Sequence, residues 1–145
     1  MKIARAVFYV EALGNFIAAC MLFFTPGTFV SQFVNQSVPL LPLELFRWYG
    51  VLLYVFVYVM LRALAQPNEN TLAVVVEGFL LGDLIQLVGC YLFVSAGGTW
   101  TPALVGFTAA TIILAGVRTY WLWGHTAATG YPMLRSNELR SLDEN

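Results

Sequence analysis

Four long apolar stretches alternate with short polar segments along the chain. Each stretch has about the 20 mostly apolar residues that an α-helix needs to cross a lipid bilayer. The segments between them contain proline, glycine or asparagine, the residue types that favour turns. The pattern therefore predicts four membrane-spanning helices, at about residues 6–24, 45–65, 71–95 and 102–123.

The lengths of the connections predict how these helices are arranged. The second and third connections are short, so consecutive helices must run antiparallel. We expect an all-α integral membrane protein, with a four-helix transmembrane up-down-up-down bundle over residues 1–124 and a cytoplasmic polar tail over residues 125–145. The first connection, residues 26–43, is longer and rather apolar, which predicts a segment that packs on the bundle or lies in the membrane interface.

The composition supports the membrane assignment. Of the 145 residues, 59% are apolar and 10% are charged, against about 45–50% and about 25% in ordinary soluble domains. The mean hydropathy is +0.75 and the net charge is −1. These values exclude a soluble enzyme domain and a disordered chain, and they leave no basic surface for nucleic acid.

Basic residues near the helix ends predict the orientation, because cytoplasmic loops carry an excess of Lys and Arg. With four spans, both termini and the connection near Pro67 lie on the same side. That side receives Lys2, Arg5, Arg62, Arg135 and Arg140, whereas the opposite side has Arg47. We therefore expect a multi-pass protein with both termini in the cytoplasm, in the endoplasmic reticulum if the source is eukaryotic.

Polar side chains within the predicted spans point to function, since such groups are costly in a membrane and usually face the bundle interior. They follow helical spacing in each span, which predicts one shared interior site. The polar positions are Glu11 and Asn15; Arg47, Tyr54, Tyr58 and Arg62; Glu77, Asp83 and Gln86; and Thr108, Thr111 and Arg118.

The charges in this set do not balance. A rise of about 1.5 Å per residue places Glu11, Glu77 and Arg118 at a similar depth, with Asp83 deeper. An alternative is a purely structural role, with Glu77 and Arg118 as a buried ion pair. Because three carboxyls share one nearby arginine, we expect at least one carboxyl to be protonated at neutral pH. A neutral acid beside an ionised carboxylate is suited to general acid–base chemistry.

Other kinds of site are not indicated. The sequence has no catalytic-triad signature, no glycine-rich phosphate loop and no metal-ligand spacing, so we expect no metal and no cofactor. We interpret Cys20 and Cys90 as packing residues and His125 as a solvated residue at the interface. Carboxylate chemistry in an apolar cavity suits a lipophilic substrate with one oxygen-bearing centre. Epoxide opening requires a proton donor, a base and an oriented water or hydroxyl group.

Several short motifs resemble those of a known group of proteins. They are Asn15, Leu45-Phe46-Arg47-Trp48-Tyr49-Gly50, Val76-Glu77-Gly78 with Gly82-Asp83, and Val117-Arg118. The pattern resembles small four-span membrane proteins of fungi, some of which accompany polyketide pathways and act as epoxide hydrolases or cyclases on polyene epoxides. More distantly, it is similar to four-helix DoxX-type proteins. The resemblance implies that Glu77, Asp83 and Arg118 belong to the site.

We therefore predict a cofactor-independent, membrane-embedded enzyme that opens an epoxide by hydrolysis or cyclisation. Asp83 is the expected proton donor, Glu77 the base, and Arg118 the charge between them. The expected substrate-binding residues are Glu11, Asn15, Tyr54, Tyr58, Thr108 and Thr111. Three alternatives remain open at this stage: a non-catalytic partner subunit, a double-bond isomerase and a proton-coupled carrier, which would need a homodimer to enclose a pathway.

Overall fold

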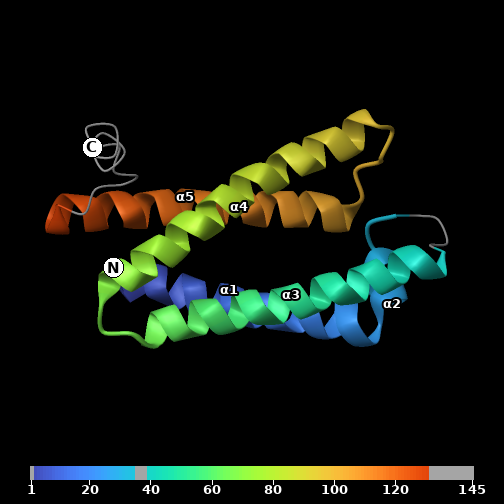
Figure 1. Ribbon diagram of the computed structural model, residues 1–145. Helices are drawn as coiled ribbons and strands as arrows, with labels where there is room; N and C mark the ends of the chain where they lie inside the picture. Colours follow the sequence, from blue (N-terminus) through green and yellow to red (C-terminus); the bar gives the residue numbers. More distant parts are fainter. Residues whose placement is uncertain (1, 35–38, 131–145) are drawn as a thin grey trace, which may run out of the picture.

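The computed structural model describes residues 2–34 and 39–130, which form helices and the turns between them. The helices of these residues are α1 (Lys2–Phe24), α2 (Pro26–Val30), α3 (Leu40–Ala65), α4 (Glu69–Ser95) and α5 (Pro102–Thr129). The four long helices alternate in direction, so the predicted all-α up-down-up-down bundle is confirmed (Figure 1). The predicted polar tail lies outside the described residues from residue 131 onward.

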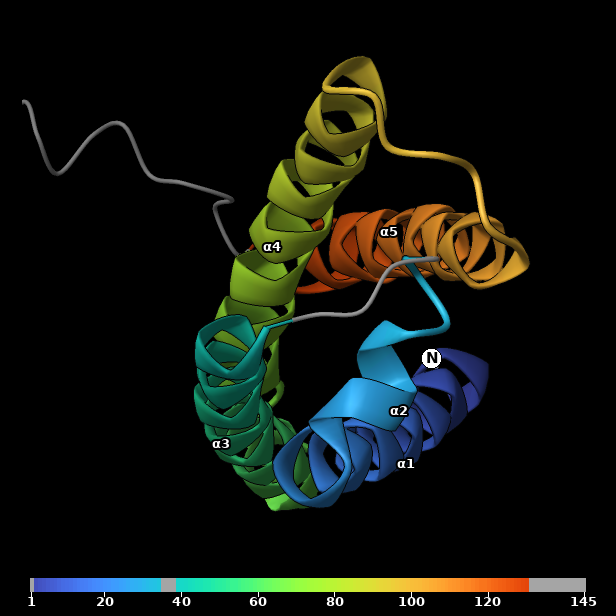
Figure 2. The same cartoon turned by 90° about the vertical axis from the view of Figure 1, so that its right-hand side faces the viewer.

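The bundle consists of two helix pairs. α1 packs mainly on α3, and α4 packs mainly on α5, with fewer contacts between the pairs. α4 crosses α5 at an angle, so its C-terminal end lies far from α3 (Figures 1 and 2). The pairs therefore meet most closely at the end of the bundle that contains the α3–α4 turn, the start of α1 and the end of α5. We call this the α3–α4 end.

The helices extend beyond the predicted spans. α3 begins five residues earlier than predicted, at Leu40, and includes Pro42. Proline is tolerated there because the first backbone N–H groups of a helix have no intrahelical acceptor. α4 begins at Glu69, where the Asn68 side chain accepts a hydrogen bond from the Asn70 backbone N–H at 3.0 Å.

The end of α5 corrects the predicted boundary of the bundle. The helix continues past residue 123 to Thr129 and stops at Gly130, whose φ of 67° is a left-handed conformation that favours glycine. His125 consequently lies inside the helix and is only 1% exposed. The expectation that it is a solvated residue at the start of the tail is wrong.

The first connection packs on the bundle, as its apolar composition predicts. Its first part forms α2, in which Pro26 and Val30 are buried. Further on, the Phe33 ring meets the edge of Phe107 in α5, with ring centroids 6.0 Å apart. This connection therefore contacts both helix pairs near the end where they diverge.

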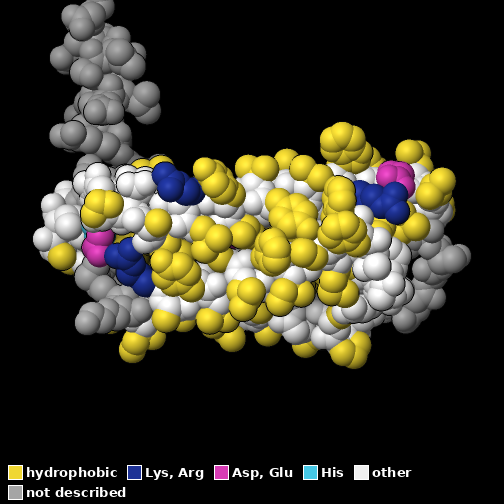
Figure 3. All heavy atoms as spheres, turned by 90° about the horizontal axis from the view of Figure 1, so that it is seen from below, with side chains coloured by type: hydrophobic (Ala, Val, Ile, Leu, Met, Phe, Trp, Pro, Cys, Tyr) yellow, Lys and Arg dark blue, Asp and Glu magenta, His cyan; other side chains and the backbone are white. Residues whose placement is uncertain are grey.

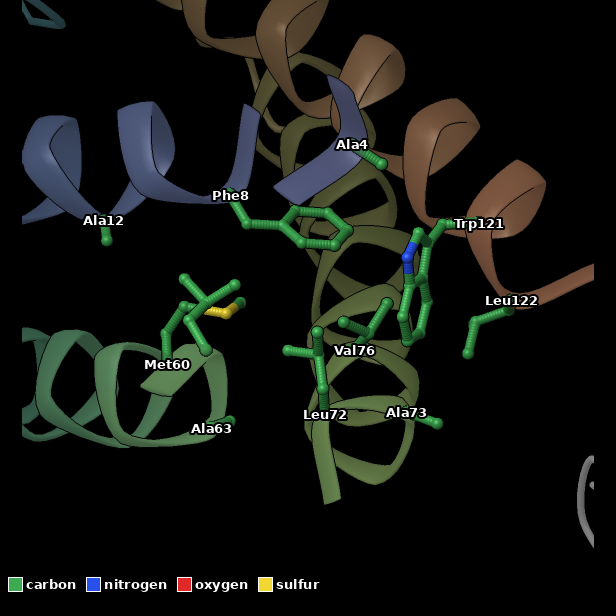
Figure 4. Packing of buried hydrophobic residues seen from close by; sticks show 11 residues of the cluster. Ala4, Phe8, Ala12, Met60, Ala63, Leu72, Ala73, Val76, Trp121 and Leu122 are labelled. Atoms are coloured by element: carbon green, nitrogen blue, oxygen red, sulfur yellow. The ribbon is translucent and has the colours of Figure 1, made fainter. Parts of the chain in front are cut away.

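The hydrophobic core lies at the α3–α4 end, where all four long helices contribute side chains (Figure 4). Phe8 is fully buried and meets Trp121 edge-on, with ring centroids 6.1 Å apart. Small residues such as Ala12, Ala63 and Ala73 let the helices approach closely around these rings. This packing fixes the relative positions of α1, α4 and α5, the three helices that form the site described below.

The outer surface of the bundle is apolar. On the face shown in Figure 3, charged side chains lie near the two ends and hydrophobic side chains cover the region between them. All four long helices are long and apolar enough to cross a membrane. Large side chains on their outer faces, such as Leu81 and Ile113, are more than half exposed. The chain is a multi-pass membrane protein.

Candidate acid–base site

A buried arginine on α5 forms the centre of the candidate site. Arg118 is 0% exposed, although it lies on a helix surrounded mostly by apolar residues. Its Nη1 donates a hydrogen bond to Asp83 Oδ2 on α4, and its Nη2 donates one to Glu11 Oε1 on α1. The carboxylate side chains are 7% exposed for Glu11 and 12% for Asp83. Three helices thus meet at one charged cluster, which we call the Glu11–Arg118–Asp83 cluster.

Two neighbouring side chains complete its surroundings. The Phe79 ring lies 5.4 Å from Arg118 Cζ, which is within the range of a cation–π interaction. Phe79 is one helical turn before Asp83, so both side chains are on the face of α4 that contacts α5. Asn15 is one turn after Glu11 and is close enough to interact with its carboxylate. The cation is therefore held by two carboxylates and an aromatic face, away from water.

Hydrogen bonding in the cluster is incomplete. Glu11 Oε2 and Arg118 Nε are buried, and neither has a hydrogen-bond partner within residues 2–34 and 39–130. A buried polar atom without a partner is energetically costly. Two carboxylates against one guanidinium also leave a formal charge of −1 in a region from which water is excluded. One proton on a carboxyl oxygen would remove this charge.

The partners of Arg118 differ from those predicted. The sequence pointed to Glu77 as the carboxyl within reach of Arg118, whereas the structure pairs Arg118 with Glu11 and Asp83. Because α5 ends at Thr129, Arg118 lies about 16 Å from the helix end, deeper than predicted. Glu77 also precedes Phe79 by two residues, a rotation of about 200° around the axis of α4. Its side chain therefore lies on nearly the opposite face of the helix from Phe79.

Glu77 nevertheless remains a notable residue. It is partly buried, and its Oε1 is buried with no hydrogen-bond partner in the described part of the chain. Its side chain lies about 9 Å along α4 from Asp83, on the side of the α3–α4 end. Its predicted role as the base stays a prediction.

A second polar contact joins α4 to α5 next to the cluster. Gln86 Nε2 donates to Thr111 Oγ1 at 3.0 Å, and the Thr111 hydroxyl donates to the Phe107 carbonyl at 3.0 Å. Gln86 is one turn beyond Asp83, so the two polar contacts are consecutive along α4. Thr108 lies one further turn away on α5, and its hydroxyl donates to the Leu104 carbonyl at 2.8 Å. Thr111 and Thr108 thus continue the polar face of α5 from Arg118 toward the opposite end.

The predicted tyrosines lie elsewhere. The Tyr54 hydroxyl donates to Cys20 Sγ at 3.1 Å, which joins α3 to α1 rather than to the cluster. Tyr58 is 65% exposed and lies on the outer surface of α3. Glu44 and Arg47 form an ion pair near the start of α3, as a surface pair three residues apart is expected to do. The structure does not bring these four residues into the acid–base site.

A second polar group, at the α3–α4 end, was not predicted from the sequence. His125 stacks on Trp121 with ring centroids 5.2 Å apart, and its Nε2 lies 3.1 Å from Asn70 Oδ1. Glu69 Oε2 is 3.7 Å from His125 Nδ1, and Glu69 Oε1 is 3.6 Å from Arg5 Nη1. The one-turn spacing of Trp121 and His125 was a signal that α5 continued. These contacts tie α1, α4 and α5 together beside the core.

The described residues contain no group of three or more His, Cys, Asp or Glu side chains that could hold a metal ion. Comparisons with protein-family models, curated proteins and solved structures gave no match to this chain. The chemistry of the Glu11–Arg118–Asp83 cluster is therefore the basis for a functional proposal.

Proposed function

We propose that this protein is a membrane-embedded acid–base enzyme that opens the epoxide ring of a lipophilic substrate, by hydrolysis or by cyclisation. One observation supports it above the others: a fully buried arginine hydrogen-bonded to carboxylates from two other helices. Epoxide opening by a one-step mechanism needs an acid for the oxirane oxygen and a base for the attacking oxygen. Burial and the like charge of a second carboxylate favour a proton on one of the two carboxyls, while the arginine favours the ionised form of the other.

The exposure of the two carboxyls suggests their roles. Asp83 is the more exposed of the pair, at 12% of its side chain, and it adjoins the polar contact of Gln86 with Thr111. We assign Asp83 as the proton donor to the oxirane oxygen. Glu11 supplies the compensating carboxylate, with Asn15 beside it. The base is Glu11, or Glu77 on the same helix as Asp83.

The proposed step conserves atoms and charge. The Asp83 carboxyl proton moves to the oxirane oxygen as the carbon–oxygen bond of the ring breaks. The oxygen of water, or of a hydroxyl group on the substrate, forms a new bond to that carbon and gives its proton to the base. Hydrolysis yields a diol and cyclisation an oxygen heterocycle. Return of a proton from the base to Asp83 restores the enzyme.

The surroundings favour an apolar substrate. The cluster lies between helices whose outer faces are exposed to the bilayer, so the membrane is the natural source of the substrate. Phe79 on α4 and Thr111 on α5 add apolar surface beside the cluster. The resemblance to fungal epoxide hydrolases and cyclases of polyketide pathways agrees with this choice of substrate class.

The activity can be tested with membranes that contain the full-length chain. A panel of lipophilic epoxides, including polyene epoxides, is incubated in water enriched in oxygen-18, and products are followed by mass spectrometry. We expect loss of at least one epoxide, with one heavy oxygen in a diol product or none in a cyclised product. Membranes with the Asp83→Asn variant are the matched control. Equal conversion in both preparations would contradict the proposal and favour a non-catalytic partner subunit.

The proposed orientation places both termini in the cytoplasm, because the α3–α4 end carries Arg5 and Arg62 and the opposite end carries Arg47 paired with Glu44. Trypsin added to sealed vesicles of known orientation should cleave after Arg135 or Arg140 when the cytoplasmic face is outside. Detergent should be required for cleavage in vesicles whose cytoplasmic face is inside. The reverse pattern would show that the chain is inserted the other way.

A further inference from the structure

A groove lies on the outer surface of the bundle, where α3 meets the beginning of α4. Its volume is about 320 Å³. The apolar part of its wall includes Val59 from α3 and Val75 from α4. These helices belong to different pairs and make fewer contacts with each other than the partners within a pair. The groove is therefore an open seam that faces the lipid, and we call it the α3–α4 groove.

The polar residues of this groove gather toward its interfacial end. Arg62 lies three residues before the end of α3, Gln66 follows directly after the helix, and Thr71 is in the first turn of α4. Val59 and Val75 lie deeper along the two helices, by about 4–6 Å. The groove is thus polar near the membrane interface and apolar toward the membrane interior, the same polarity as a phospholipid.

Arg62 is suited to bind an anion. Arg5, Arg47 and Arg118 each form an ion pair, whereas Arg62 has no ion-pair partner within residues 2–34 and 39–130. Its exposed guanidinium lies beside Gln66 and Thr71, whose amide and hydroxyl groups can donate further hydrogen bonds. Guanidinium groups bind phosphate through paired N–H donors. In the orientation proposed above, this end also lies in the cytoplasmic leaflet, where anionic lipids are concentrated.

We propose that the α3–α4 groove binds one anionic phospholipid, with an acyl chain between Val59 and Val75 and the phosphate on Arg62. Such a lipid would fill the seam between the two helix pairs. One basic residue near an anionic lipid contributes about 1 kcal/mol, which corresponds to about a fivefold preference over a zwitterionic lipid. This site is separate from the Glu11–Arg118–Asp83 cluster and does not depend on the proposed reaction.

A second groove provides an internal comparison. It lies between α1 and α3, has a volume of about 250 Å³, and includes Leu13, Phe16 and Leu61 in its wall. None of the described residues that line it is charged. This groove can contact an acyl chain, but its described lining has no charged group that would distinguish one lipid headgroup from another.

Native mass spectrometry of the full-length protein, purified in a neutral detergent, can test the proposal. The protein is mixed with equal amounts of phosphatidylglycerol and phosphatidylcholine that have identical acyl chains. We expect about fivefold more bound phosphatidylglycerol with the wild type and about equal binding with Arg62→Gln. Arg47→Gln is the matched control, because Arg47 is paired with Glu44 at the other end of α3, and it should keep the preference.

Variants that fill each groove test the acyl-chain contact. Val59→Trp should lower retention of both lipids several-fold, whereas Leu13→Trp, in the α1–α3 groove, should leave the headgroup preference unchanged. No preference in the wild type, or an unchanged preference in Arg62→Gln, would overturn the proposal. If glycerol phosphate displaced the bound lipid as readily as another whole phospholipid does, the groove would recognise the anion alone. That result would overturn the role of the acyl chain.

Discussion

Arg118→Leu is expected to destabilise the folded protein by about 3–5 kcal/mol, the cost of removing one partner from a buried ion pair. The variant leaves Glu11 and Asp83 facing each other without a cation, and both side chains are at least 88% buried. It also removes the contact between Arg118 and Phe79. Protonation of the two acids limits the loss. Unfolding in detergent, followed by circular dichroism or by the exposure of Cys90 to a thiol reagent, measures it.

Two further variants separate charge from packing. Arg62→Leu is the matched control, because Arg62 is exposed and its loss should change stability by no more than about 0.5 kcal/mol. The triple variant Glu11→Gln, Asp83→Asn, Arg118→Leu removes all the charges and should recover most of the lost stability. Equal, small effects of Arg118→Leu and Arg62→Leu would show that Arg118 is not held in the interior.

Asp83→Asn and Glu11→Gln are each expected to lower turnover of an identified epoxide by about 10²–10⁴-fold, the usual contribution of a general acid or base. Each change leaves one ionised carboxylate paired with Arg118, so the cluster stays neutral without the shared proton and the protein should fold as the wild type does. The double variant leaves Arg118 without a carboxylate and should lose stability as well. Turnover per folded molecule and the unfolding transition are measured on the same preparations.

Two other carboxyls complete this series. Glu77→Gln is expected to abolish turnover if Glu77 is the base, and to leave it unchanged if Glu11 fills that role. Glu44→Gln changes a carboxyl on the membrane rim, outside the site, and should leave turnover at the wild-type value. Full activity in either Asp83→Asn or Glu11→Gln would remove that residue from the mechanism.

The sequence was sufficient to predict the fold, because four apolar runs separated by turn residues allow few arrangements in a membrane. The helix boundaries were predicted less accurately where polar residues continue a helix beyond its apolar stretch. Gly124, His125 and Thr126 lower the local hydropathy, so the last span was ended at Trp123. The helix nevertheless continues to Thr129, and Trp121 and His125 stack within it.

The composition of the site was also predictable in part. Glu11, Asp83 and Arg118 stand out because ionisable residues are costly in a membrane. Which carboxyls contact Arg118 depends on how α4 crosses α5 and on the rotation of each helix about its axis. The spacing of polar residues within one helix gives neither the crossing angle nor the rotation, so it cannot distinguish Glu77 from Glu11 as the partner of Arg118. Tyr58 was misleading for another reason: an amphipathic ring at helical spacing is as well suited to the lipid interface as to the interior.

We propose that Glu11 and Asp83 share Arg118 and a single proton. Infrared spectroscopy of the protein in lipid bilayers at pH 7 tests this directly, through the carbonyl stretching band of a protonated carboxylic acid. The Glu77→Gln background removes the third buried carboxyl from the spectrum. In that background we predict one protonated carboxyl, and we predict that its band disappears in both Asp83→Asn and Glu11→Gln, since each leaves a single ionised carboxylate that already balances Arg118. Absence of the band before these changes, or its persistence in both variants, would contradict the account.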